Sequence, residues 1–491
     1  MRLFFSLILL LSILEANAQN LNDVVRYSVV DFASTGRAIG AGGSFSAIGA
    51  DFSLVGSNPA GLASFRKSEF VITPGFDLNF NTANLSNDNS IMTNDTRRRF
   101  HLSNAGFVIA SHSPERSWKT LNFGIGVNRI ANFHNNITYS GATVGSITDR
   151  WLELSQDFTV DEVLQDPFEA GLAYDAGATF MLDGYSDRDY FTDYFFSNQP
   201  SLSKSQTIEQ RGYISEFAIS LAGNYRDKLY LGATLGLPIL FFEEERTYRE
   251  EDIGDQVDIF DELTFTENLS ASGGGANFKI GAIYRVNQKL RVGIAAHTAT
   301  VLNVDEDFST SLDYRFTDPN FPEQGLQQSP QGIFEYSIRT PWRLSASLGS
   351  IIARRGFISA EVEYVDYTSS RFNFDSGAGG DIARENDLNE EINTTLNTAA
   401  NVRIGGEWTY KIYRFRAGVI LIGAVSDDVG NRQTYHAGLG LRKNAFFMDL
   451  AYRLSNSENS FFAYRTQLLG SQQVEDSSTE NLFVLTFGFK I

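Results

Sequence analysis

The sequence predicts an all-β protein, a 14-stranded antiparallel transmembrane β-barrel with an N-terminal plug in its lumen. Three observations lead to this fold class: apolar and polar residues alternate through many segments, the chain begins with a secretory signal, and short and long connections alternate. The alternation is clearest in Asn481 to Ile491. No apolar run approaches the ~18 residues that a spanning helix needs, so we expect strands to cross the membrane.

The composition excludes several classes of protein. The chain has 491 residues and no cysteine, so a disulfide framework, a thiolate metal site and a cysteine nucleophile are impossible. A formal net charge of −19 argues against nucleic acid as a partner, since phosphate binding needs clustered Lys and Arg. The 40 Phe, 20 Tyr and 42 Gly suit the aromatic girdles and close strand packing of a barrel.

Residues 1–18 form the expected signal peptide. Arg2 supplies a basic start, Leu3 to Leu14 an apolar stretch, and Ala16-Asn17-Ala18 a cleavage site of small residues. We therefore expect an exported protein whose mature chain begins at Gln19.

Residues 19–66, rich in Gly, Ala and Ser, form the expected hatch that plugs the lumen. Barrels of about eight strands are filled by side chains and those of about sixteen leave an aqueous channel, so fourteen strands would leave a lumen that needs an obstruction. Pro59 biases Asn58 away from helix, and Gly61 permits a turn that alanine could not make.

Residues 67–491 form the expected barrel, because fourteen segments in this range carry the alternation. Single-chain bacterial barrels have an even number of strands. The expected strands are 67–80, 100–112, 118–132, 212–226, 228–245, 261–286, 289–302, 332–352, 356–370, 397–411, 413–426, 432–443, 445–455 and 479–491.

The connections between these strands differ in length. Barrels of this class have short periplasmic turns and long outer loops, so we expect the hatch and both termini in the periplasm and the protein in the cell outer membrane. The short turns are His112–Ser117, Arg226–Lys228, Val286–Lys289, Ile352–Gly356, Lys411–Ile412 and Lys443–Asn444.

The apolar faces of the strands carry no charge, whereas the opposite phases hold residues such as Glu216, Arg403 and Asp449. A Lys or Arg on the lipid face near the midplane would cost ~2–4 kcal/mol, so this segregation is expected of a barrel. A soluble β-sandwich also alternates, but the signal peptide, the aromatic residues near short turns and the unequal loops favour the barrel. The clearest apolar faces are Phe217, Ile219, Leu221 and Tyr225; Leu290, Val292, Ile294 and Ala296; Val402, Ile404, Trp408 and Tyr410; and Phe446, Met448, Leu450 and Tyr452.

The long connection 133–211 is expected to be an extracellular loop with helices over the barrel mouth. Thr159 to Glu162 has capping-box spacing, and apolar residues on both sides of Pro167 predict two short helices. These residues are Val160, Val163 and Leu164, then Phe168, Leu172 and Ala173.

The third expected strand contains a phase slip. Its apolar face runs to Val127, but Arg129 then falls where an apolar residue is due and Ile130 where a polar one is due. An extra residue near Asn128–Arg129 would make a bulge, and Gly124 and Gly126 on the inward phase would leave space beside it. The strand could equally leave the membrane there, and the sequence favours neither interpretation.

One N-terminal motif resembles a known family. The run Asn58-Pro59-Ala60-Gly61-Leu62-Ala63, preceded by Gly36-Arg37-Ala38 and Gly42-Gly43, resembles the hatch of the FadL-type outer-membrane transporters, which include the long-chain fatty acid and TodX-like aromatic hydrocarbon channels. Thr340 to Arg343 and Phe357 to Tyr367 also resemble this family, as does the count of fourteen strands. The resemblance covers nearly the whole mature chain, although the outer loops match only in kind.

The resemblance implies passive transport of hydrophobic small molecules, either long-chain fatty acids or aromatic hydrocarbons. The cargo would be captured among the outer loops, enter a lumenal pocket and leave sideways into the bilayer when the hatch shifts. The implied lateral opening in the third strand is Gly124, Gly126, Asn128 and Arg129. The implied hatch residues are Asn58, Pro59, Ala60, Gly61 and Leu62.

The expected partners are outer-membrane lipid, lipopolysaccharide and a hydrophobic small-molecule substrate, and we expect a monomer. No cofactor or metal is expected: the acidic clusters, such as 243–262, lack calcium-loop spacing, and the five histidines lack zinc-ligand spacing. We expect no enzyme activity, although His112-Ser113 keeps an outer-membrane lipid hydrolase open as a second function. An envelope scaffold barrel for protein secretion and a haem uptake protein also stay open.

Overall fold

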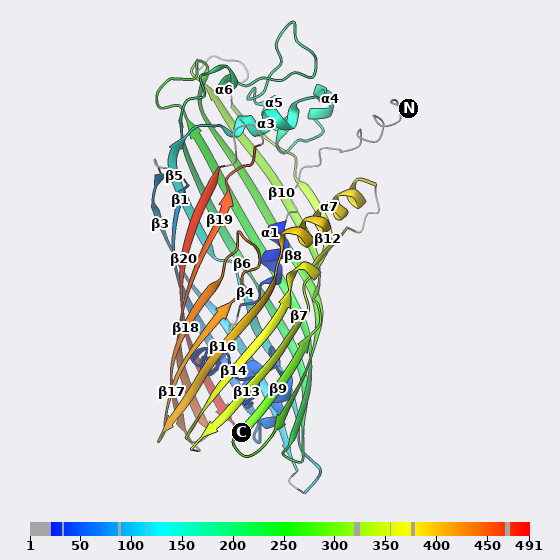
Figure 1. The fold of residues 1–491 in the computed structure, drawn as a ribbon, viewed down its shortest axis with the longest axis vertical. Helices are drawn as coiled ribbons and strands as arrows, with labels where there is room; N and C mark the ends of the chain where they lie inside the picture. The colour runs from blue at the N-terminus through cyan, green and yellow to red at the C-terminus, as the bar shows by residue number, and fades with distance from the viewer. Residues whose placement is uncertain are drawn as a thin grey trace.

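The computed structural model describes residues 21–31, 34–86, 90–113, 115–318, 325–353, 355–374, 379–466 and 472–491. The signal peptide predicted at residues 1–18 lies outside this part of the chain. A tall β-barrel dominates the molecule, with helices at one end and further chain inside the barrel (Figure 1). Within the described ranges, no helix combines the length and apolar character needed to cross a membrane.

Antiparallel pairing runs around the whole wall. β1 (Glu69–Leu85) pairs with β3 (Thr93–His112) on one side and with β20 (Gln473–Lys490) on the other, so the first and last long strands close the barrel. The predicted fold, a closed 14-stranded antiparallel barrel, is confirmed.

At some places in the wall, two consecutive strands follow one another along the same neighbouring strand. β4 (Trp118–Asn132) and β5 (Asn135–Thr143), for example, both pair with β6 (Leu202–Tyr225). The other strands are β2 (Ser90–Ile91), β7 (Leu229–Glu251), β8 (Phe260–Arg285), β9 (Leu290–His297), β10 (Val301–Phe316), β11 (Gly325–Gln328), β12 (Gly332–Arg339), β13 (Arg343–Ile352), β14 (Gly356–Asp366), β15 (Arg371–Phe374), β16 (Thr398–Tyr410), β17 (Tyr413–Ile422), β18 (Arg432–Lys443) and β19 (Phe446–Phe462).

The side chains divide between the two faces of the wall as the alternation predicts. Ile294, Trp408 and Leu450 face outward and are exposed, whereas Glu216 and Asp449, at inward positions of β6 and β19, are buried. An apolar exterior around a charged interior is the arrangement expected of a barrel wall that meets hydrocarbon.

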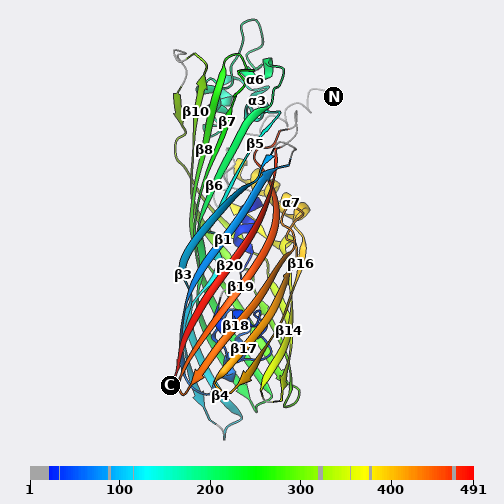
Figure 2. The ribbon, with the colours of Figure 1, turned by 90° about the vertical axis from the view of Figure 1, so that its left-hand side faces the viewer.

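The two ends of the barrel differ (Figures 1 and 2). One end carries the short turns and the C-terminus, and we call it the short-turn end. The other, the loop end, carries helices and the tall part of the wall, where β7 and β8 have 23 and 26 residues against 10 in β17. α7 (Gly379–Thr395) packs against β15 and η3 (Tyr367–Ser369) at the loop end of the shorter strands (Figure 1).

The stretch 133–211 is not a helical loop throughout, because its ends belong to β5 and β6. The middle holds α3 (Ile147–Ser155), α4 (Val160–Val163), α5 (Ala170–Asp175) and α6 (Asp193–Phe196). α4 and α5 are the two predicted helices. α3 was not predicted although it has a sequence signal, since Ser146 and Asp149 form a capping box at its start.

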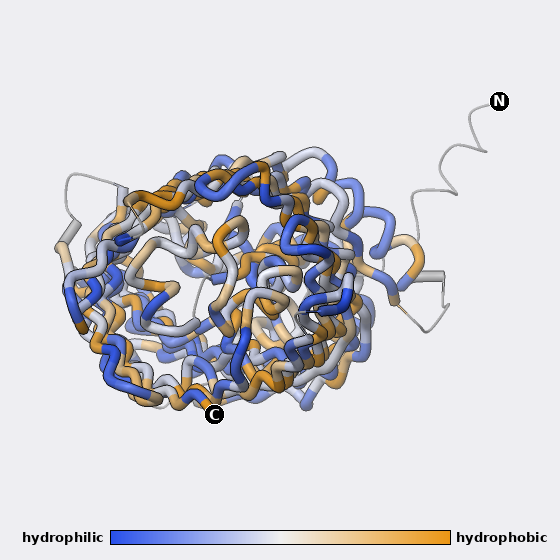
Figure 3. Tube along the Cα trace, turned by 90° about the horizontal axis from the view of Figure 1, so that it is seen from below, coloured by the Kyte–Doolittle hydropathy of each residue, from blue (hydrophilic) through white to orange (hydrophobic). Residues whose placement is uncertain are grey.

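Residues 21–31 and 34–65, which precede β1, lie inside the barrel, where they cross the lumen (Figure 3). They form α1 (Leu21–Ser28), α2 (Gly36–Gly40), η1 (Phe52–Val55) and η2 (Pro59–Ser64). We call residues 21–31 and 34–65 the lumenal segment. Its η2 packs against β6, β7 and β8, while α2 packs against β17 to β20, so it touches the wall on several sides.

Candidate functional site: the lumenal segment and the break in the wall

Glycines in the barrel wall form the seat of the lumenal segment. A Cβ atom at Gly281 of β8 would collide with the side chain of Asn58, and a Cβ atom at Gly232 of β7 would collide with the backbone of Pro59. Glycine is needed at these inward positions because another segment of chain approaches so closely. Other wall glycines that meet the lumenal segment include Gly293, Gly405, Gly418 and Gly438.

The predicted hatch residues form η2 and its N-cap, and all are buried: Asn58, Pro59, Ala60, Gly61 and Leu62. Asn58 is extended, its side chain accepts a hydrogen bond from the Ala60 nitrogen at 3.2 Å, and its Nδ2 donates to the Ser46 oxygen at 2.9 Å. The predicted turn role of Gly61 is wrong, because its φ is not in the left-handed region. Glycine at this position lets Leu54 pack directly against η2, because a Cβ atom there would displace the Leu54 side chain.

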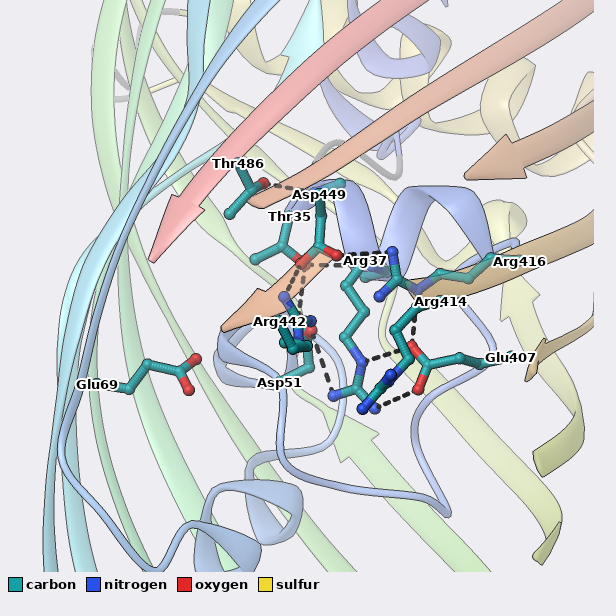
Figure 4. A network of polar contacts seen from close by, with 12 residues as sticks. Thr35, Arg37, Asp51, Glu69, Glu407, Arg414, Arg416, Arg442, Asp449 and Thr486 are labelled. Atoms are coloured by element: carbon teal, nitrogen blue, oxygen red, sulfur yellow. Dashed lines mark hydrogen bonds and ion pairs between the residues drawn. The ribbon is translucent and has the colours of Figure 1, made fainter. Parts of the chain in front are cut away.

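An ionic network joins the lumenal segment to neighbouring strands (Figure 4). Nε of Arg37 in α2 lies 3.1 Å from Glu407 of β16, and the same carboxylate accepts a hydrogen bond from Arg416 of β17 at 2.7 Å. Arg416 and Arg442 each contact Asp449 of β19 at 2.8 Å. The side chains of Arg416 and Asp449 are fully buried, so loss of one partner would leave an uncompensated charge and cost ~3–5 kcal/mol.

A second set of ion pairs involves Asp31, which lies between α1 and α2. Its carboxylate contacts Arg432 of β18 at 3.0 Å and Arg453 of β19 at 2.9 Å. Burial by itself would raise the pKa of Asp31, but the two guanidinium charges outweigh burial and hold that pKa below its usual range. The Asp31 nitrogen also donates to the carbonyl oxygen of Ile130 in β4 at 2.7 Å. Asp31 therefore connects β4 with β18 and β19 across the lumen.

The backbone ladder between β3 and β4 ends partway along the wall, and we call this place the wall break. The last pair is Asn104 with Asn128; in the described chain, the rest of β3 pairs with β1 while β4 and β5 continue along β6. The pairing of β4 with β6 shifts between Arg129 and Ala131, so Ile130 is an extra residue. The irregularity predicted near Asn128–Arg129 thus lies one position further on.

A second irregularity, in β3, was missed. The register of β3 against β1 shifts between Thr73 and Pro74, where Ser103 is left over. Pro74 has no N–H to donate to the ladder, which favours a bulge at this position. The sequence carries a signal for it, because the outward apolar residues change phase between Leu102 and Phe107.

Between the wall break and the pairing of β2 with β5 nearer the loop end, the two edges overlap instead of joining. The inward side chain of Asn79 in β1 donates to the His134 oxygen, just before β5, at 3.0 Å, and Asn132 of β4 donates to Asp77 of β1 at 2.8 Å. β4 and β5 therefore lie on the lumen side of β1 and β3. We call the layer of side chains between these strand pairs the overlap.

The space predicted beside Gly124 and Gly126 is filled by the lumenal segment, so that expectation is wrong. A Cβ atom at Gly126 would lie 2.5 Å from the ring of Phe52 in η1, and one at Gly124 would lie 3.1 Å from Leu62. These glycines admit the lumenal segment to the foot of the wall break.

A chain of polar side chains connects the wall break with α2. Asn104 donates to Asn128 at 3.0 Å, Thr73 donates to Asn104 at 3.0 Å, and the hydroxyls of Thr73 and Thr486 lie 2.7 Å apart. Thr486 in turn accepts a hydrogen bond from the Gly36 nitrogen at 2.7 Å. A movement of α2 would therefore disturb the last residues that hold β3 to β4.

The lumenal segment separates two cavities. A cavity of about 110 Å³ toward the loop end has mixed walls, with Ile130 and Leu302 beside the polar side chains of Asn128, Glu216 and Lys279. A cavity of about 450 Å³ at the short-turn end is lined by several arginines, Arg285 among them. Above the smaller cavity, α1 closes the lumen with an apolar cluster that includes Val24, Tyr27, Phe133 and Phe242.

Two serine–histidine pairs bear on the hydrolase hypothesis. His101 Nε2 lies 2.8 Å from the Ser103 hydroxyl and His101 Nδ1 lies 2.9 Å from Asp77, in the order of a catalytic triad. Ser103 has no exposed surface, however, and the geometry at Nδ1 is not that of a hydrogen bond. A substrate cannot reach this hydroxyl. The predicted pair His112-Ser113 lies at a short turn.

No protein-family model and no curated protein matches the chain. Solved structures do. A FadL homologue of Pseudomonas aeruginosa has a TM-score of 0.55 at 13% identity, over 94% of this chain and 99% of that one. The P. putida toluene transporter TodX and the Ralstonia pickettii toluene transporter TbuX each give a TM-score of 0.51 over the same shares, at 11% and 14% identity. The chain therefore has the fold of these transport proteins, and these neighbours are not enzymes.

Proposed function

We propose that the protein is a passive outer-membrane channel for hydrophobic small molecules, gated by the lumenal segment, with lateral release at the wall break. One observation supports this most strongly: the segment that blocks the lumen is linked by hydrogen bonds to both edges of the break. Asp31 donates directly to β4, and Gly36 reaches Asn104 of β3 through the hydroxyls of Thr486 and Thr73. The neighbours of known structure include toluene transporters, in keeping with such cargo.

The surface of the barrel supports a membrane setting. Each of the six short turns carries an exposed Lys or Arg, and exposed aromatic residues such as Trp118, Tyr284 and Tyr410 flank these turns. Aromatic residues at such a level mark the interface between hydrocarbon and headgroups. Short turns face the periplasm in barrels of this class, so we propose that the short-turn end, the lumenal segment and the C-terminus are periplasmic.

The proposed path has three parts. Cargo enters among α3 to α6 at the loop end, passes the apolar cluster around α1 once that helix yields, and reaches the smaller cavity above η1. It then leaves between β3 and β4, where the backbone ladder already ends at Asn104 and only side-chain hydrogen bonds still hold the two edges together. No chemical step occurs.

Uptake into liposomes tests this function. The purified protein should accelerate entry of at least one class among fatty acids, alkylbenzenes and haem, relative to liposomes that carry an unrelated barrel of similar size. Equal entry of every class in the two preparations would contradict transport. Co-purification with secretion proteins, together with no uptake, would instead favour the scaffold function.

A further inference from the structure

The overlap beyond the wall break contains a buried arginine that lacks partners. Arg129 of β4 is 8% exposed, and its guanidinium lies over the ring of Tyr213, 4.6 Å from the centroid. Nε and Nη1 are buried and have no hydrogen-bond acceptor among the described residues. Buried guanidinium groups are normally paired, because an unmet donor on a charged group costs more than a neutral one.

The strand geometry explains how this arginine comes to be buried. Arg129 has the outward phase of β4, which would place it in lipid if β3 were still paired at that level. Because β4 has moved to the lumen side of β1 and β3, the outward face of β4 meets the inward face of β3 instead. Arg129 therefore points into the overlap, directly after Asn128 and before Ile130, which both line the smaller cavity.

The charge that acts most strongly on Arg129 is positive, and the carboxylate of Asp95 lies further toward the loop end of β3. Arg99 of β3 repels Arg129 electrostatically, and Arg97 of the same strand is nearby. The carboxylate of Asp77 attracts both Arg99 and Arg129, but it already accepts a hydrogen bond from Asn132. Glu209 lies 3.9 Å from Arg97 and closer, at 3.2 Å, to Arg211. His134 and His101 add no negative charge.

We propose that the overlap is a headgroup site for the anionic end, a carboxylate or phosphate, of a single-chain amphipath during its lateral exit. Arg129 would donate Nε and Nη1 to two oxygens of the headgroup, the geometry that guanidinium groups offer to such anions. The apolar tail would lie along the outer face of β3, where Phe100 is 81% exposed and packs 4.7 Å from Phe76. A neutral aromatic hydrocarbon would leave these donors unpaired. This inference rests on the proposed function.

The test compares ligands that share a tail but differ in the headgroup. Binding of dodecanoate and dodecanol, and their uptake into liposomes, are measured for the native protein, for Arg129→Gln and for Arg98→Gln as control. Arg98 is the neighbour of Arg99 in β3 but faces outward and is exposed. Arg129→Gln should weaken dodecanoate binding ~10-fold or more, because the variant loses the charge-assisted hydrogen bonds to the headgroup. Dodecanol binding should change less than about twofold, and Arg98→Gln should alter neither.

Three further arms keep the outcomes distinct. Arg129→Lys should restore part of the dodecanoate affinity, and Arg99→Gln should lower the dodecanoate affinity of the native protein. Folding of each variant is checked by its electrophoretic mobility without heating. If Arg129→Gln does not fold, these two variants take its place in the test. An equal loss for dodecanoate and dodecanol would overturn the headgroup site. Acetate binding as tight as that of dodecanoate would show a site for free anions and overturn the amphipath assignment. A native protein that moves neither ligand, nor an alkylbenzene or haem, would refute the proposed function itself.

Discussion

At the scale of single residues, the proposed function depends on wall glycines as much as on charged side chains. Gly232 and Gly281 allow Asn58 and Pro59 to lie directly on the wall, so the position of η2 is fixed by backbone contact. The ion pairs of Arg37 and Asp31 then anchor the segment on the opposite strands. The lumenal segment is therefore held on several sides of the wall by non-covalent contacts.

The first prediction concerns this seat. Gly281→Ala should displace Asn58 and loosen η2, because the added methyl group would occupy the place of the Asn58 side chain, at a cost of ~1–3 kcal/mol. Protease cleavage of residues 46–64 should become measurably faster in the variant. Gly274→Ala in the same strand is the control, since the only atom near a Cβ there lies 3.9 Å away. Equal cleavage of the two variants would contradict the seat.

At the scale of elements, the two irregular strands matter most. The phase slip in the third strand could be located from the sequence to within one residue, because an arginine stands where the apolar face should continue. The overlap of β3 and β4 has no sequence signal, since that arrangement depends on hydrogen bonds from Asn79 and Asn132 between strands far apart in the chain. The contents of the lumen were likewise beyond prediction: Phe52 fills the space that Gly124 and Gly126 offer.

The second prediction removes the bulge. Deletion of Ile130 should let β4 pair with β6 without a shift and should also remove the carbonyl that the Asp31 nitrogen binds. We expect a folded barrel whose cargo uptake falls ~10-fold or more, in the liposome assay. Ile130→Gly is the control, because it keeps the extra residue and the carbonyl. A deletion variant with native uptake would show that release does not use this break.

At the scale of the whole molecule, the strand count, the closure and the direction of the apolar faces follow from the sequence. Alternation reports which face of each strand meets apolar surroundings, and pairing in chain order is the simplest closure for such strands. Long-range ties such as Arg37 with Glu407 could not be predicted in this way, because charged residues on inward phases have many possible partners in a lumen.

The third prediction tests the apolar exterior. Ile294→Lys should destabilise the barrel by ~2–4 kcal/mol, since Ile294 is 63% exposed on the outer face of β9, away from the short turn. Tyr284→Lys, next to the short turn in β8, should cost only ~0–1 kcal/mol, because lysine there reaches the headgroups. Unfolding by denaturant from lipid vesicles measures both values. Equal costs would contradict the proposed membrane level.

The central claim is that the lumenal segment closes a pore which the wall alone would leave open. Its most direct test is the conductance of single barrels in a planar bilayer, compared between the native protein and a variant that lacks residues 19–58. The account predicts a folded variant with a steady, large ion conductance beside a nearly closed native barrel. A native barrel and a folded variant with the same conductance would contradict it.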